Sequence, residues 1–153
     1  MSKCRGFKTF KERGEWVELV FMATAVRRGF KITKPWGDSS SYDVGVESGE
    51  RTLRVQVKST DCRVGSGYLC GFKPNHKSEP YTVKKIDFFA AYVIPENAWY
   101  VLPAKVVLAV KSFNLSLCPM ENRKYAKYGR YRYEGYRDAW ALLMPVVGEG
   151  EVR

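Results

Sequence analysis

Apolar residues recur at intervals of three and four between residues 9 and 28, a spacing that predicts an amphipathic α-helix. We expect one face of this helix to be buried, formed by Val17, Val20, Phe21, Thr24 and Ala25. Thr9 is a suitable N-terminal cap, and Glu12 three residues later fits a capping box. Gly29 follows two arginines and is expected to end the helix.

The pattern then changes to an alternation of apolar and polar residues, which is typical of strands with one buried face. Two strands are predicted, over residues 42–46 and 52–58. The residues expected on their buried faces are Tyr42, Val44 and Val46 in the first strand and Leu53, Val55 and Val57 in the second. The segment between them, residues 47–50, contains a Ser-Gly pair that supplies the positive φ angle of a tight turn. The sequence therefore predicts a β-hairpin.

The polar faces of this hairpin carry a distinctive group of side chains. Asp43 lies on the first strand, and Gln56 and Lys58 lie on the second. Carboxylate and amide oxygens are hard donors of the kind that Mg²⁺ takes. A lysine on the same face can stabilise negative charge that develops on a phosphate. The hairpin is thus a candidate site for metal-assisted chemistry on phosphate.

The middle of the chain predicts further elements. Residues 62–81 are rich in glycine and proline and read as a basic loop, with a possible short strand over residues 68–72. Residues 86–94 and 99–102 predict a second hairpin, and its nearly continuous hydrophobicity favours a strand covered on both faces. Residues 104–110 predict a short helix after a proline.

Tyrosines and five cations alternate in the segment 121–133, which either contacts nucleic acid or is a solvated loop. Residues 134–144 predict a last helix, with Tyr136 and Trp140 spaced to face the core. Residues 1–147 are therefore expected to form a single domain, followed by a frayed tail at 148–153.

The amino-acid composition limits the classes of molecule that the protein is expected to bind. The chain of 153 residues has 26 Lys and Arg against 16 Asp and Glu, a formal net charge of +10, which favours nucleic acid or an anionic membrane surface. No run of about 18 apolar residues is present, so we expect no membrane span. Residues 1–15 lack the apolar region of a signal peptide, and we expect an intracellular, cytoplasmic protein.

The four cysteines and the one histidine lack zinc-finger spacing, so reduced structural thiols are expected. A zinc site and a Cys–His nucleophile remain alternatives. His76 lies in a segment that reads as a loop, and a role as a general base stays open.

Asp43, followed by a hairpin and then Gln56-Val57-Lys58, resembles the motif of the PD-(D/E)XK nuclease superfamily. Two positions depart from it: Tyr42 stands where the motif has proline, and Gln56 stands where it usually has an acidic residue. The wider phrase GDSSSYDV…RVQVKST, with Arg13-Gly14…Glu18 upstream, resembles the branch that contains group I intron homing endonucleases of this fold. It resembles archaeal Holliday-junction resolvases more distantly.

The resemblance implies an α/β fold with a central mixed sheet flanked by helices. It also implies an endonuclease that hydrolyses double-stranded DNA, works as a homo-oligomer (dimer or tetramer) and uses Mg²⁺, for which Mn²⁺ may substitute. The ion would be bound by Asp43, Gln56, the Val57 carbonyl and Glu18, with Lys58 stabilising charge. Glu15 is the alternative to Glu18.

Candidate DNA contacts are polar or basic residues of the loops and the Tyr-rich segment: Ser39, Ser40, Arg63, Lys73, Lys77, Arg123, Lys124, Lys127, Arg130 and Arg132. Asp38 on the serine-rich loop is either part of a turn or a second acid near the metal. Two other functions are compatible with the charge. One is a nucleic-acid-binding domain that keeps the nuclease fold without catalysis, and the other is a basic RNA-associated or ribosome-associated protein.

Overall fold

A computed structural model of the chain describes residues 6–74, 79–119 and 131–146, and its first element is helix α1 (Phe10–Arg27). The hydroxyl of Thr9 accepts a hydrogen bond from the backbone N–H of Glu12 at 3.1 Å. The Glu12 carboxylate accepts one at 2.8 Å from the N–H of Lys8 rather than that of Thr9, so the expected capping box is shifted by one residue. None of the helices in these ranges is long and apolar enough to cross a membrane.

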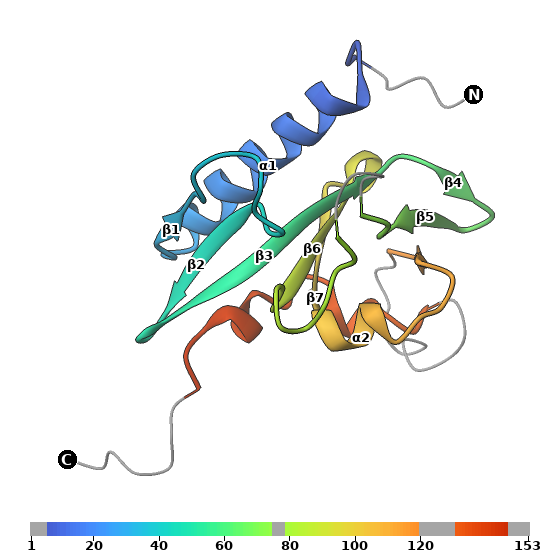
Figure 1. Cartoon of the computed structure of the whole chain (residues 1–153). Coiled ribbons are helices and arrows are strands. Elements are labelled where there is room, and N and C mark those ends of the chain that lie inside the picture. Colours follow the sequence, from blue (N-terminus) through green and yellow to red (C-terminus); the bar gives the residue numbers. More distant parts are fainter. Residues whose placement is uncertain (1–5, 75–78, 120–130, 147–153) are drawn as a thin grey trace.

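A five-stranded sheet forms the centre of the molecule, in the order β1-β2-β3-β6-β7 (Figure 1). Its strands are β1 (Ile32–Thr33), β2 (Val44–Ser48), β3 (Arg51–Thr60), β6 (Phe88–Val93) and β7 (Ala98–Pro103). Strands β3 and β6 are parallel, and the other neighbours are antiparallel. The sheet is therefore mixed, which confirms the predicted α/β class.

Helix α1 packs on one face of this sheet (Figure 1). Its fully buried residues are Val17, Phe21 and Ala25, all members of the predicted apolar stripe. They meet a cluster of side chains from β2, β3, β6 and β7 that includes Val44, Val55 and Trp99. Burying this stripe is the main reason that the amphipathic segment is held as a helix against the sheet.

The predicted hairpin is present, but its strands extend further than expected. Ser48 pairs with Arg51, so the turn has only two residues and Gly49 takes the positive φ of 61°. The prediction of a strand over residues 42–46 and a four-residue turn was wrong at these boundaries. Because Glu47 and Ser48 continue the ladder, the regular strand is displaced toward the turn, and Asp43 lies just before β2.

Strand β6 is covered on both faces, as its hydrophobicity predicted. Phe88, Ala90 and Tyr92 face the cluster beneath α1, whereas Phe89, Ala91 and Val93 face a second cluster. A 3-10 turn η1 (Ile94–Glu96) leads into β7, and Asn97 takes the left-handed conformation with φ 47°.

A small sheet and a short helix cover the second face, where the sequence analysis expected flanking helices and one possible short strand. The small sheet has the order β4-β5-β8, from β4 (Arg63–Val64), β5 (Gly67–Gly71) and β8 (Asn114–Leu117). The expected short strand over residues 68–72 corresponds to β5, and the helix predicted over 104–110 is α2 (Ala104–Leu108). Buried residues of the small sheet belong to the same core cluster as Phe89 of β6: Tyr68, Cys70, Leu115 and Leu117.

The prediction of a helix over residues 134–144 was wrong. The segment contains two 3-10 turns, η4 (Glu134–Tyr136) and η5 (Trp140–Leu143). Arg137 between them is extended and forms a bridge with Tyr100, and Asp138 has φ 52°. Pairing with the exposed edge of β7 thus replaces helical hydrogen bonds. Trp140 is buried as predicted and stacks on Phe21 with ring centroids 5.6 Å apart.

The thiols in the described part of the chain are free. Cys70 and Cys118 are buried and Cys62 is exposed. Burial raises the pKa of the Cys70 thiol to about 12, which keeps it protonated. Cys4 and His76 lie outside the described residues.

Candidate active site

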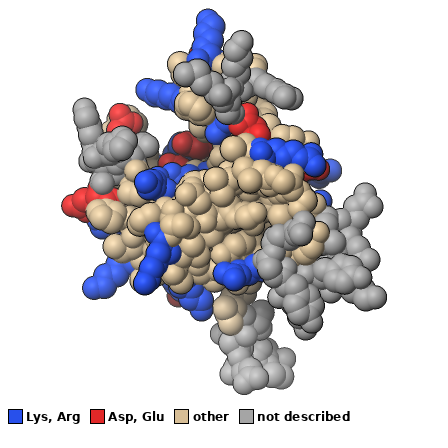
Figure 2. Space-filling model, turned by 90° about the vertical axis from the view of Figure 1, so that its right-hand side faces the viewer, with Lys and Arg blue, Asp and Glu red and all other residues tan. Residues whose placement is uncertain are grey.

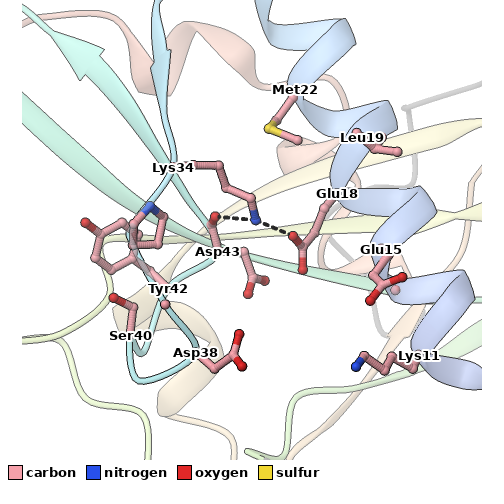
Figure 3. Close-up of a pocket in the computed structure, with 13 residues that line it drawn as sticks. Lys11, Glu15, Glu18, Leu19, Met22, Lys34, Asp38, Ser40, Tyr42 and Asp43 are labelled. Atoms are coloured by element: carbon pink, nitrogen blue, oxygen red, sulfur yellow. Dashed lines mark hydrogen bonds and ion pairs between the residues drawn. The ribbon is translucent and has the colours of Figure 1, made fainter.

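An open cavity of about 600 Å³ lies between α1 and the loop that joins β1 to β2 (Figure 3). Its charged residues come from both sides. Lys11, Glu15 and Glu18 are on α1, and Lys34, Asp38 and Asp43 are on the loop. The cavity is thus lined by four carboxylates and two ammonium groups, although the protein as a whole is strongly basic.

The Asp43 carboxylate is fixed to strand β3. The backbone N–H of Asp43 donates to the carbonyl of Val55 at 2.9 Å, which continues the hairpin ladder by one residue. Its side-chain Oδ2 accepts a hydrogen bond of 2.8 Å from the N–H of Val57. This contact places the acid beside the stretch of β3 that carries Gln56 and Lys58.

The environment of Asp43 disfavours its charged form. Burial raises the pKa of this carboxyl to about 6, against the opposing effect of the Val57 N–H. The neighbouring charge of Glu18 raises the pKa further, whereas Lys58 and Lys34 lower it. Two carboxylates that are close together and poorly solvated favour a nearby cation. Asp43 and Glu18 therefore supply two oxygen donors of the kind that a divalent metal ion takes.

Lys34 connects the two acids. Its ammonium donates to Oε2 of Glu18 at 2.5 Å and to the backbone carbonyl of Asp43 at 3.1 Å, as the dashed lines in Figure 3 show. Glu15 lines the same cavity but is exposed. Of the two candidate glutamates, Glu18 is the one whose charge acts on Asp43. Lys34 was not recognisable as a site residue from the sequence, where it stands before a Pro-Trp-Gly turn.

Lys58 lies beside this cavity, not in it. On β3 it alternates with Val55 and Val57, which face α1, so its ammonium extends toward the other face of the sheet. The ammonium donates to the hydroxyl of Tyr81 at 3.0 Å and to the carbonyl of Lys73 at 3.4 Å. Lys58 also lines a second cavity of about 620 Å³ at the start of α1.

Lys11 and Gly14 line both cavities, so the two are adjacent. Gln56 is half-buried on β3 and does not line the cavity shared by Asp43 and Glu18. Within the described ranges, no three His, Cys, Asp or Glu residues are grouped closely enough to hold a metal ion. Two carboxylates are therefore assembled here, and further ligands would have to be amide or carbonyl oxygens.

Comparison with known proteins identifies the family. A family model described as PD-(D/E)XK endonuclease matches residues 8–138, which is most of the chain. The chain belongs to the PD-(D/E)XK endonuclease family. The match spans Glu18, Asp43 and Lys58, and enzymes of this family generally use divalent metal ions.

The structure of a bacterial homing endonuclease, I-Ssp6803I, is similar to this PD-(D/E)XK endonuclease over almost its whole length. The two chains are 26% identical with a TM-score of 0.72, and the match covers 90% of this chain and 92% of the other. No match was found among curated protein sequences. The protein is thus a nuclease of the homing-endonuclease-like branch, as the hairpin motif and the wider sequence around it predicted.

The candidate DNA contacts of this endonuclease lie in several places. Ser40 lines the acidic cavity, and Ser39 is exposed on the same loop. Arg63, Lys73 and Arg132 are also exposed. The remaining candidates lie outside the described residues: Lys77, Arg123, Lys124, Lys127 and Arg130. On the face drawn in Figure 2, the described lysines and arginines are spread around a broad uncharged area and do not merge into one patch.

Trp36 is a further candidate that the sequence analysis treated only as part of a turn. Its side chain is 99% exposed, on the loop that leads from β1 to Asp43. A solvent-exposed aromatic ring beside an active site is available to stack on a nucleic-acid base. A tryptophan between Pro35 and Gly37 was the signal in the sequence.

Proposed function

We propose that this nuclease cleaves double-stranded DNA by metal-dependent hydrolysis of phosphodiester bonds, in the manner of a homing endonuclease. The observation that carries the proposal is the position of Asp43. Its carboxylate faces a cavity that also contains Glu18, and it is anchored to the N–H of the residue before Lys58. Strand β3 thereby places the Asp43 carboxylate, which shares its cavity with Glu18, near Lys58.

The residues that would hold the ion are Asp43 and Glu18, with the amide oxygen of Gln56 and the carbonyl of Val57 as the uncharged ligands. Mg²⁺ is the expected ion and Mn²⁺ a possible substitute, because both prefer oxygen donors. When bound, such an ion activates a water and polarises the scissile phosphate. Asp43 must be ionised to bind it, and its contact with Val57 keeps the carboxylate in place for this.

Lys58 would stabilise the negative charge that develops on the phosphate. Tyr81 and the Lys73 carbonyl hold its ammonium from one side, and the Tyr81 ring also lies 5.1 Å from it. Lys58 is therefore positioned before substrate arrives, which reduces the entropy that must be lost on binding.

DNA would be held by the serine-rich loop, the exposed basic residues and stacking on Trp36. The net charge of +10 supports an electrostatic contribution from phosphate neutralisation. Each copy of the chain carries one such site, so cutting both strands of a duplex favours a homo-oligomer. Light scattering of the purified protein, with and without DNA, tests this expectation through the molar mass.

A cleavage assay tests the proposed function. Supercoiled plasmid, linear duplex and a four-way junction are incubated with the protein in Mg²⁺, in Mn²⁺ or in EDTA. We expect nicking or cutting of the duplex substrates with either metal and none in EDTA. Glu50→Ala and Lys111→Ala, two exposed residues away from the cavities, serve as controls and should cut like the wild type.

Two results would count against the proposal. Cleavage that persists in EDTA would contradict the metal-dependent mechanism. Tight duplex binding without cleavage of a random-sequence DNA library in Mn²⁺ would favour the non-catalytic DNA-binding domain, because such a library contains many short target sites.

A further inference from the structure

The Lys34 ammonium occupies the space between the two acids of the cavity. It lies 2.5 Å from Oε2 of Glu18 and 3.1 Å from the backbone oxygen of Asp43. Both oxygens belong to residues proposed to hold the metal ion. A positive charge of the protein itself therefore stands at the Glu18 carboxylate, where a divalent cation would bind, and beside the backbone of Asp43 (Figure 3).

The positive charge of Lys34 offsets the repulsion between the two neighbouring carboxylates. Glu18 and the largely buried Asp43 repel each other, and without a cation this repulsion would push their carboxylates apart. Lys58 also lowers the pKa of Asp43, but its ammonium is hydrogen-bonded to Tyr81 and to the Lys73 carbonyl rather than to Glu18. Lys34 is the lysine that contacts Glu18 among the described residues.

The contact is also easily broken. The Lys34 side chain is 49% exposed and that of Glu18 is 25% exposed. An ion pair this open to solvent contributes little to stability, and the flexible four-carbon stem of lysine allows the ammonium to leave the site. The ammonium can therefore move into water when a stronger cation arrives.

We propose that Lys34 is a built-in counter-ion, which holds Glu18 beside Asp43 in the metal-free enzyme and is displaced when the divalent ion binds. The inference rests on the proposed function, since the displacing ion is the one that the site would use. It makes Lys34 a positioning residue that limits metal affinity, with a role separate from that of Lys58.

Metal binding to the full chain without DNA provides the test. Mg²⁺ and Ca²⁺ are titrated by calorimetry into the wild type, Lys34→Met and Lys31→Met. Lys31 is exposed three residues earlier, so its variant removes the same charge without the contact to Glu18. We expect Lys34→Met to bind either ion about fivefold more tightly than Lys31→Met, the size expected when an exposed ion pair no longer has to be broken.

A double-mutant cycle shows whether the effect acts through Glu18. In a Glu18→Gln background, adding Lys34→Met should leave metal affinity unchanged within error. Thermal unfolding in EDTA gives a second readout. Lys34→Met should melt at a lower temperature than Lys31→Met, and saturating Mg²⁺ should remove the difference.

The outcomes separate this inference from the proposed function. A wild type that binds neither ion, and whose melting temperature no metal changes, overturns the metal site and the inference together. A wild type that binds metal no more weakly than Lys34→Met overturns the inference alone. If circular dichroism shows that Lys34→Met does not fold, Lys34→Gln removes the charge with a smaller change in polarity and takes its place.

Discussion

The half-buried carboxyl of Asp43 titrates at about pH 6 rather than at its ordinary 3.8, because burial and the charge of Glu18 outweigh the effects that lower its pKa. Between these two values the folded state binds more protons than the unfolded state, so the free energy of unfolding falls as pH rises from about 4 to 6. Above pH 6 the ionised group costs the metal-free protein about 3 kcal/mol at most. Function and stability therefore conflict at this residue.

Asp43→Asn should relieve this cost. In EDTA at about pH 7.5, we expect its free energy of unfolding to exceed that of the wild type by up to about 3 kcal/mol, with no gain near pH 4. Urea unfolding at the two pH values measures the difference. Glu50→Gln, at the exposed hairpin turn, is the control and should show no such pH dependence. Equal stability of wild type and Asp43→Asn at the higher pH would contradict the assigned environment.

Gln56 replaces an acid of the family motif, which leaves the proposed site with one negative charge fewer. Gln56→Glu should bind Mg²⁺ more tightly, by roughly tenfold, because ligand charge is a main determinant of cation affinity. Calorimetric titration measures this, with Gln56→Met as the matched uncharged variant. Unchanged affinity in Gln56→Glu would mean that residue 56 does not contribute to the metal site.

Tyr81 tests whether Lys58 must be held in place. Tyr81→Phe removes the hydroxyl that bonds the lysine at 3.0 Å but keeps the ring, which packs on Phe89. We expect the single-turnover cleavage rate to fall by about 3- to 10-fold, equivalent to about 1 kcal/mol, while DNA affinity is unchanged. Loss of affinity with an unchanged rate would instead assign Tyr81 to DNA binding.

Gly14 lies inside helix α1 and lines both cavities. A glycine inside a helix lowers the free energy of unfolding relative to alanine. A Cβ added there would meet nothing within 4 Å, so Gly14→Ala should raise the free energy of unfolding by about 0.5–1 kcal/mol. Gly14 lines both cavities, so if DNA binds across them we expect the same change to weaken DNA binding.

Urea unfolding and DNA titration in Ca²⁺ measure the two effects of Gly14→Ala. Ala23→Gly, on an exposed position of the same helix, is the matched control and should lose about as much stability without a change in DNA affinity. A Gly14→Ala variant with both higher stability and unchanged affinity would place the DNA elsewhere.

The elements with a strong local period were predictable from the sequence. Helix α1, the hairpin of β2 and β3, and the doubly covered β6 each contain enough residues of one pattern to define them. The small second sheet was not, because β4 and β8 have two and four residues and pair only through the tertiary fold. The spacing of Tyr136 and Trp140 fits a helix, yet the pairing of Arg137 with Tyr100 determines an irregular chain there.

At the scale of the whole molecule, the sequence indicated Asp43, Glu18 and Lys58 as site residues. It did not indicate that the two acids line one cavity and Lys58 the adjacent one. The Asp43 carboxylate accepts a hydrogen bond from the Val57 N–H and lines the cavity that contains Glu18. The Lys58 ammonium instead contacts Tyr81. Lys34 and Tyr81 acquire their contacts through packing of segments 16 and 23 residues away in the chain. The hydrophobic periodicity of a sequence carries no information on contacts between such distant residues, so they become visible only in the folded structure.

The central claim is that Asp43 and Lys58 form a catalytic centre rather than part of a DNA-binding surface. The most direct test measures duplex binding in EDTA and single-turnover cleavage in Mg²⁺ on the same preparations of wild type, Asp43→Ala and Lys58→Ala. We predict that both variants lose cleavage by more than about 100-fold, in line with other electrostatic groups at active sites, while Asp43→Ala binds DNA at least as tightly as the wild type. Cleavage by Asp43→Ala at close to the wild-type rate would contradict the account.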